Sequence, residues 1–441
     1  MKTAENGLGW GGIFRLGLVQ TALGAMVVLA TSTFNRVMVV ELALPAMVPG
    51  ILVGVHYITQ LFRPRMGHGS DVGGRSTPWI IGGMLVLGLG TLGAAVSTAL
   101  LESKAASGFA LAAVAYVLIG LGVGAAGTNL LVLLAKRVAE NRRGAAASVV
   151  WMMMIAGFAV TATTAGRYLD PYSGSRLVAV TATVVGIALL VMLIALRGLE
   201  RGAAPVSQAP DESRKSFSQA LRQVWAEAEA RQFTIFVFTS MLAYSAQDLI
   251  LEPFAGTVFG LSVGASTSLS GLKHQGVFAG MITVAVVTST ASRTWLGSLK
   301  MWTVAGCLGS ALALGLLSMA SLEAPAWPLS ATVFALGFAN GAFAVAAIGS
   351  MMANAGHGAQ AREGVRMGLW GAAQASAFGI GGFAGTVLSD AAHALLGSPV
   401  QAYALVFGLE SALFLISAVL AAQLRVHRTS RTPASRGPVF T

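Results

Sequence analysis

Seven ionisable side chains stand in stretches of this sequence that are otherwise almost wholly apolar. They are two cations, three carboxylates and two histidines: Arg36, Lys273, Glu41, Asp248, Glu252, His56 and His274. An ionisable group in an apolar setting is costly unless it is paired or has a function. The five charged residues can interlock as ion pairs that hold segments together, or they can bind a substrate and transfer protons. The sequence leaves both alternatives open.

The two histidines permit a further chemistry. A neutral imidazole in apolar surroundings is a good axial ligand for a divalent metal, including the magnesium of a chlorin ring. The alternative for His56 and for His274 is a hydrogen-bonded residue in helix packing. No directly bound metal is expected, because the single cysteine, Cys307, stands in an apolar run and provides no cysteine cluster.

Long apolar segments must position these residues. The chain is 55% hydrophobic and 10% charged, with 54 glycines in 441 residues, and this composition places it in a membrane. Apolar runs of about twenty residues can cross the hydrocarbon core of a bilayer, and they predict twelve transmembrane helices. These are expected at 16–40, 46–66, 78–99, 109–135, 145–166, 176–196, 232–251, 267–290, 301–320, 327–350, 366–388 and 400–423.

The basic residues indicate how the spans are oriented. With the N-terminus inside, all but five of the 28 Lys and Arg fall on the cytoplasmic side. The five exceptions are Arg36, Lys104, Arg167, Arg176 and Lys273. We therefore expect a multi-pass protein of a bacterial inner membrane, with both termini in the cytoplasm and no cleavable signal peptide in residues 1–15. The net charge of +11 then reflects topology and anionic lipid, and no nucleic-acid partner is expected.

The longest polar stretch divides the chain into two halves. We expect a six-helix bundle at 1–196, a cytoplasmic linker with an amphipathic helix at 197–231, a second six-helix bundle at 232–424 and a cytoplasmic tail at 425–441. The halves are weakly similar at an offset of 220 residues, which matches Ala139, Arg142, Gly144, Phe158 and Asp170 with Ala359, Arg362, Gly364, Phe378 and Asp390. Such repeats predict two bundles that face a central cavity, with the charged residues near its extracytoplasmic end.

A glycine-rich turn stands between the second and third spans. Gly67, Asp71, Gly74 and Arg75 have the spacing of the major-facilitator loop, in which an Asp follows a Gly by four residues and Gly-Arg comes next. The glycines permit a tight turn, while the two charges can pair with neighbouring helix ends. The predicted fold class is therefore an all-α polytopic membrane protein with the major-facilitator fold.

Four segments resemble one branch of that superfamily. Phe34–Ala46, Phe62–Arg75, Thr77–Gly83 and Gln247–Phe254 are similar to the PucC-like bacteriochlorophyll delivery family, although Ser76 stands where a second basic residue is expected. The resemblance implies an assembly factor for bacterial light-harvesting antenna complexes, with bacteriochlorophyll as its cargo. It also implies the photosynthetic inner membrane as location. Its implied partners are antenna polypeptides, bacteriochlorophyll synthase and the membrane insertion machinery.

Two other functions stay open. A proton-coupled secondary transporter of a small solute would use Glu41, Asp248 or Glu252 for coupling, and a structural organiser would recruit partners without touching pigment. No enzyme is expected, because the sequence has no nucleotide-binding loop, metal-protease helix pair or nucleophile elbow.

Overall fold

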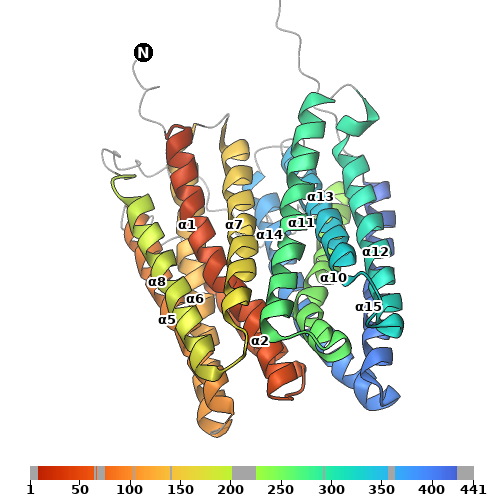
Figure 1. Ribbon diagram of the computed structural model, residues 1–441. Helices are drawn as coiled ribbons and strands as arrows, with labels where there is room; N and C mark the ends of the chain where they lie inside the picture. Colours follow the sequence, from red (N-terminus) through yellow and green to blue (C-terminus); the bar gives the residue numbers. More distant parts are fainter. Residues whose placement is uncertain are drawn as a thin grey trace, which may run out of the picture.

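The molecule is a set of long helices that run side by side (Figure 1). The computed structural model describes residues 8–63, 66, 75–102, 105–139, 142–200, 225–291, 294–355 and 363–424. Within these ranges the first span is one continuous helix composed of α1 (Trp10–Val28), η1 (Leu29–Thr33), α2 (Phe34–Arg36) and η2 (Val37–Glu41). The others are α3 (Met47–Thr59), α5 (Thr77–Leu101), α6 (Ala105–Arg137), α7 (Arg143–Tyr168), α8 (Gly174–Leu196), α10 (Ala228–Phe259), α11 (Val263–Thr290), α12 (Leu299–Glu323), α13 (Leu329–Ala355), α14 (Glu363–Leu396) and α15 (Pro399–Gln423). We call the face at which α1 begins the terminal face, and the face at which the first span ends the distal face.

Nine of the helices in the described ranges are long and apolar enough to cross a membrane. The remaining three that complete the predicted twelve are α3, α11 and α14. These three lie where the halves of the chain meet, because α3 packs against α14 and α11 packs against α7. A span that faces protein needs less apolar surface than one that faces lipid, which explains the weaker signal. The predicted all-α polytopic membrane fold is confirmed.

Helix α10 extends past its predicted end. The sequence predicts a span that stops at residue 251, before Glu252 and Pro253, whereas α10 continues to Phe259 and ends at Gly260, whose φ is +66°. A proline inside a membrane helix is tolerated when neighbouring helices surround the freed backbone. Glu252, Pro253 and Phe254 are all buried here, so the helix is held by packing.

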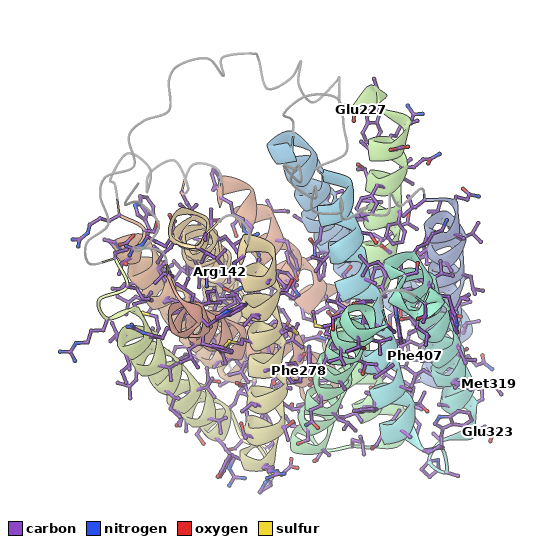
Figure 2. The ribbon with its side chains drawn as sticks, turned by 90° about the horizontal axis from the view of Figure 1, so that it is seen from above. Arg142, Glu227, Phe278, Met319, Glu323 and Phe407 are labelled. Atoms are coloured by element: carbon purple, nitrogen blue, oxygen red, sulfur yellow. The ribbon has the colours of Figure 1, made fainter. Side chains whose placement is uncertain are left out.

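Each half of the chain has its own hydrophobic core. One cluster of buried residues runs from Ile13 to Leu199 and takes in only Leu249 and Val263 from the second half. The other lies wholly between Phe233 and Leu424. In the view of Figure 2, Phe407 lies within the second group of helices, while Phe278 lies at the boundary with α7.

The contact between α7 and α11 is close enough to require glycine. A Cβ at Gly264 would lie 2.2 Å from the carbonyl oxygen of Gly166, and one at Gly271 would lie 2.6 Å from the backbone nitrogen of Thr163. Small residues at such points let two membrane helices approach backbone to backbone. This contact fixes the height of α11, which carries Lys273 and His274 of the candidate site.

Two aspartates join the halves at the distal face. Asp170, just after α7, accepts hydrogen bonds from the Ser262 hydroxyl (2.6 Å) and the Gly264 N–H (2.9 Å) at the start of α11. Asp390, in α14, accepts from the N–H groups of Ala46 (2.9 Å) and Met47 (2.7 Å) at the start of α3. Each carboxylate thus caps a helix of the other half, and the two positions are those that the internal repeat matches. We call this pair the aspartate clasp.

The predicted domain limits stay a prediction. Residues 201–224 of the linker and 425–441 of the tail lie outside the described residues. Of the predicted amphipathic helix, the structure describes the end from Trp225 onwards, and residues 228–232 form the first turns of α10.

Candidate functional site

The end of the first span is wound unusually, and this winding positions its polar residues. Two π-helical segments, η1 and η2, flank Phe34–Arg36, and such segments are frequent at functional sites. Asn35 and Arg36 are both buried as a result. The amide nitrogen of Asn35 donates to the carbonyl oxygen of Leu249 in α10 at 2.5 Å, so the first span is tied directly to the second half.

Arg36 makes the most extensive set of polar contacts in the site. Its Nε donates to the Ser266 hydroxyl at 3.0 Å, and its Nη2 donates to the Leu261 carbonyl at 2.7 Å. Its Nη1 forms an ion pair with Glu41, one helical turn further along the same span. A guanidinium with several fixed acceptors is rigidly held, so Arg36 fastens the first span to the start of α11 near the distal face.

Lys273 and Asp248 form a second, separate ion pair within the second half. Lys273 is buried in α11 and its ammonium contacts the carboxylate of Asp248 in α10. Lys273 is ten residues from the distal end of α11, which places it roughly 15 Å below that end at 1.5 Å per residue. The five predicted charges therefore do not all gather at one end. Four of them form two ion pairs, one near the distal face and the other near mid-depth.

Glu252 lies between these pairs along α10 and has few partners. Its side chain is 1% exposed. One carboxylate oxygen accepts from the Thr267 hydroxyl at 3.3 Å, while the other has no hydrogen-bond partner among the described residues. The Thr267 hydroxyl also lies 3.5 Å from that of Thr33 in the first span.

His274 is buried in α11 at the contact with α7. Its Nδ1 lies 2.8 Å from the carbonyl oxygen of Ser270. A carbonyl only accepts, so Nδ1 carries the proton and Nε2 keeps its lone pair. The ring of Phe158 stands edge to face with the imidazole, with 5.1 Å between the centroids. This is an apolar setting with the tautomer of a metal-binding histidine already fixed.

His56 has a different environment in α3. Its Nε2 lies 3.0 Å from the amide nitrogen of Gln60, whose oxygen in turn accepts from Arg63. Because an amide nitrogen only donates, Nε2 of His56 is the acceptor and its lone pair is already used. Its Nδ1 is buried with no partner in the described part of the chain. The structure places the two predicted histidines on different helices and in different halves.

One candidate was missed by the sequence analysis. Glu410 in α15 is 3% exposed, and neither carboxylate oxygen has a hydrogen-bond partner among the described residues. It lies within electrostatic range of Asp248 and Lys273. A lone carboxylate within the apolar run of residues 402–418 was a detectable signal, of the same kind that singled out Glu252.

Most of the predicted facilitator loop cannot be placed. Gly67, Asp71 and Gly74 lie outside the described residues, whereas Arg75 is exposed at the start of α5. Next to it, the Glu200 carboxylate accepts from the N–H groups of Ser76 (2.7 Å) and Thr77 (3.0 Å). Partial burial acts to raise the pKa of Glu200, but these hydrogen bonds and the charge of Arg75 outweigh it, so that the pKa is lowered.

No group of three or more His, Cys, Asp and Glu side chains in the described ranges is arranged to hold a metal ion. Cys307 is free and buried in α12. Any metal at this site would therefore have to bring most of its own ligands, as the magnesium of a chlorin does.

Comparison with known proteins assigns the chain to a family. The family model described as PUCC protein matches residues 33–429. The chain belongs to the PUCC family. Within that family, a Rhodobacter capsulatus protein named bacteriochlorophyll synthase 44.5 kDa chain is 50% identical over 94% of this chain and 95% of the relative. Protein PucC of the same species is 27% identical over 93% of this chain and 92% of the relative.

Solved structures identify the fold. The D-xylose-proton symporter superposes with a TM-score of 0.67 at 13% identity, over 92% of this chain and 97% of the symporter. A bacterial homologue of the lysosomal transporter Spinster, in an inward-facing and unoccupied conformation, gives a TM-score of 0.64 at 14% identity, over 93% of this chain and 95% of the homologue. These likenesses confirm the major-facilitator fold predicted for this PUCC-family chain.

The prediction that the chain is not an enzyme is contradicted. The relative that is 50% identical is named bacteriochlorophyll synthase 44.5 kDa chain, and this name associates that relative with an enzyme. The prediction failed because it depended on the absence of catalytic motifs.

Proposed function

We propose that this PUCC-family protein binds bacteriochlorophyll between its helices and delivers it to light-harvesting antenna polypeptides as these enter the membrane. Two relatives support the proposal: one is named as a bacteriochlorophyll synthase chain and another as protein PucC. The partners are then the antenna polypeptides, the synthase and the membrane insertion machinery. From the distribution of the basic residues we also propose that the terminal face and both termini are on the cytoplasmic side of a bacterial inner membrane.

The environment of His274 carries the pigment part of this proposal. The hydrogen bond to Ser270 holds the ring so that Nε2 presents its lone pair, and a partner on the other ring nitrogen is typical of metal-ligating histidines. Phe158 provides an aromatic wall beside it. His56 is the weaker ligand, because Gln60 occupies its acceptor nitrogen.

The test is the pigment content of protein purified in mild detergent from a phototrophic host. We expect near-infrared bacteriochlorophyll absorption at a fixed ratio to protein. His274→Ala should lower that ratio by about tenfold, the scale of loss when a metal centre loses a supporting residue. His56→Ala is the matched control and should keep its pigment.

Two results would contradict the proposal. A wild-type protein that is monodisperse and colourless would exclude stable pigment binding. A His274→Ala variant with full pigment and normal elution from a sizing column would remove His274 as the ligand.

A second function is favoured by one observation. Lys273, Asp248 and Glu410, which has no hydrogen-bond partner in the described part of the chain, lie near mid-depth in the second half. Secondary transporters place substrate and coupling-ion sites near mid-depth. A proton-coupled transporter of a small solute is therefore the alternative, and proton uptake separates it from pigment delivery.

A further inference from the structure

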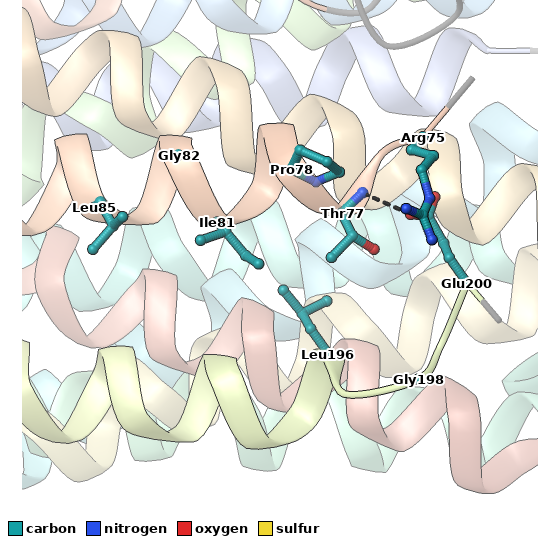
Figure 3. A pocket seen from close by; sticks show the side chains of 9 residues that line it. All are labelled: Arg75, Thr77, Pro78, Ile81, Gly82, Leu85, Leu196, Gly198 and Glu200. Carbon is teal, nitrogen blue, oxygen red and sulfur yellow. Dashed lines mark hydrogen bonds between the residues drawn. The ribbon is translucent and has the colours of Figure 1, made fainter. Parts of the chain in front are cut away.

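A lateral groove opens between α5 and α8 at the terminal face (Figure 3). Its volume is about 550 Å³. The walls are Thr77, Pro78, Ile81, Gly82, Leu85, Leu196 and Gly198, and its mouth carries Arg75 and Glu200. The groove therefore combines an apolar channel along two helices with a charged entrance at one end.

Part of the channel wall belongs to the core of the first half, since Leu196 is buried in that core and Ile81 packs against it, while the rest of the wall is exposed. Leu85 is 53% exposed, and one turn further along α5 Leu89 is 63% exposed. Gly82 adds depth, because a Cβ built there meets no atom within 4 Å. In a membrane-spanning protein such a channel is open to lipid, and its length along α5 suits a hydrocarbon chain.

The entrance is positively charged. Arg75 is exposed beside the Glu200 carboxylate, whose pKa its charge helps to lower. Arg15 donates from its guanidinium to the carbonyl oxygen of Arg197, the residue between Leu196 and Gly198 of the groove. Among the described residues that line the groove, the only carboxylate is Glu200, which accepts from the N–H groups that begin α5. The guanidinium groups of Arg75 and Arg15 thus stand near the single carboxylate of Glu200, which leaves a net positive charge among these described residues.

We propose that this groove binds one anionic phospholipid, with its phosphate at Arg75 and an acyl chain along Ile81, Gly82 and Leu85. A guanidinium binds phosphate through paired hydrogen bonds. A zwitterionic lipid also has a phosphate, but the positive charge of its headgroup reduces the net attraction to arginine. The site lies outside the candidate pigment site and does not depend on the proposed function.

The experiment is native mass spectrometry of the full-length protein released from nanodiscs that contain equal phosphatidylglycerol and phosphatidylcholine. The wild type should retain one phosphatidylglycerol in preference to phosphatidylcholine. Arg75→Gln should lower that preference by about fivefold, the scale of one basic residue at an anionic surface. Arg231→Gln is the matched control, since Arg231 is exposed near the terminal face in the other half.

A second pair of variants tests the channel. The Cβ that Gly82→Phe adds has open space around it, so the new ring can project into the groove and should reduce retention of both lipids. Gly186→Phe, on the exposed side of α8 with equally open space, should behave as the wild type. Equal lipid ratios in Arg75→Gln and Arg231→Gln would overturn the anionic preference. Equal retention in Gly82→Phe and Gly186→Phe would overturn the groove as the site.

Discussion

Seven carboxylates among the described residues fall into three kinds of environment, and each kind predicts a different response to removal. Two pair with a cation, three accept hydrogen bonds from the start of a helix, and two are buried with an oxygen that has no partner in the described ranges. Glu41 and Asp248 pair with a cation. Asp170, Asp390 and Glu200 accept hydrogen bonds at the start of a helix. Glu252 and Glu410 are the buried pair with an oxygen that lacks a partner in the described ranges. For the helix-capping group the loss of stability on removal can be stated most directly, because the free energy that a helix cap contributes has been measured in many proteins.

Glu200→Gln should lower stability by about 0.5–1 kcal/mol at pH 7, a cap's contribution reduced by solvent exposure. The folded-state pKa of Glu200 is lowered, so its contribution is present above the unfolded pKa and is lost as pH falls through the folded value. Thermal unfolding in mild detergent should therefore separate the variant from the wild type at pH 7, and the separation should shrink progressively as the pH falls below about 4.3, the ordinary Glu value.

Glu323→Gln is the control for this measurement, because Glu323 is exposed at the distal end of α12. A gap between wild type and Glu200→Gln that does not shrink as the pH falls from 7 to well below the ordinary Glu pKa would show that the capping charge is not responsible.

Residue identity could be predicted from the sequence, but residue pairing could not. The sequence singled out Arg36, Glu41, Asp248 and Lys273 as interior charges, and all four are in ion pairs. Arg36 and Glu41 are five residues apart, however, and a regular α-helix brings together residues three or four apart. The π-helical segment η2 makes that pair possible, and no sequence pattern announces such a segment.

At the scale of helices, the aspartate clasp explains how the distal face is closed. Each aspartate satisfies backbone N–H groups at the start of a helix that belongs to the other half. These are groups that a helix cannot satisfy by itself. The negative charges also complement the positive ends of the helix dipoles. The internal repeat indicated that Asp170 and Asp390 are equivalent, but their partners became known only from the structure.

Loss of the clasp should open the distal face. In an Asp170→Asn, Asp390→Asn double variant we expect a loss of about 2 kcal/mol, since two distant caps add, and the open state should gain about thirtyfold in population. Spin labels at Tyr168→Cys and Leu395→Cys report the opening, because both side chains are strongly exposed at the distal ends of α7 and α14. Cys307 is replaced by Ser beforehand.

Each single variant should produce about half of the free-energy change. Glu323→Gln, at the same face but in no such contact with the other half, should leave the distance distribution unchanged. Identical distributions in the double variant and the wild type would show that Arg36 and the α7–α11 contact suffice to close this face.

For the whole molecule, the choice between delivery and transport depends on whether protons move. A transporter needs a carboxylate that exchanges protons near mid-depth, and Glu410 beside Asp248 and Lys273 is the best placed. If the protein transports, liposomes that contain it should take up protons when substrate is added, and Glu410→Gln should abolish the uptake. Pigment delivery predicts no proton uptake in either protein, with normal antenna assembly in Glu410→Gln.

The overall architecture was predictable from the sequence because lipid imposes it. Twelve apolar runs, basic loops and a polar stretch near residue 200 suffice for the fold class. The depth of the charged groups was not predictable, since it depends on where each helix ends. Helix α10 continues beyond Pro253, and this extension places Asp248 eleven residues above the end of its helix instead of near the membrane surface.

The contact between α3 and α14 has a consequence for how the protein is made. The N–H group of Ala46 is capped by a carboxylate that follows 344 residues later in the chain, which at ordinary translation speeds means a delay of roughly 20 to 70 s. During that time the helix ends of the first half that face α14 are in the membrane without their partners. A membrane chaperone that holds α3 over this interval would shorten the period in which the first half is open to degradation.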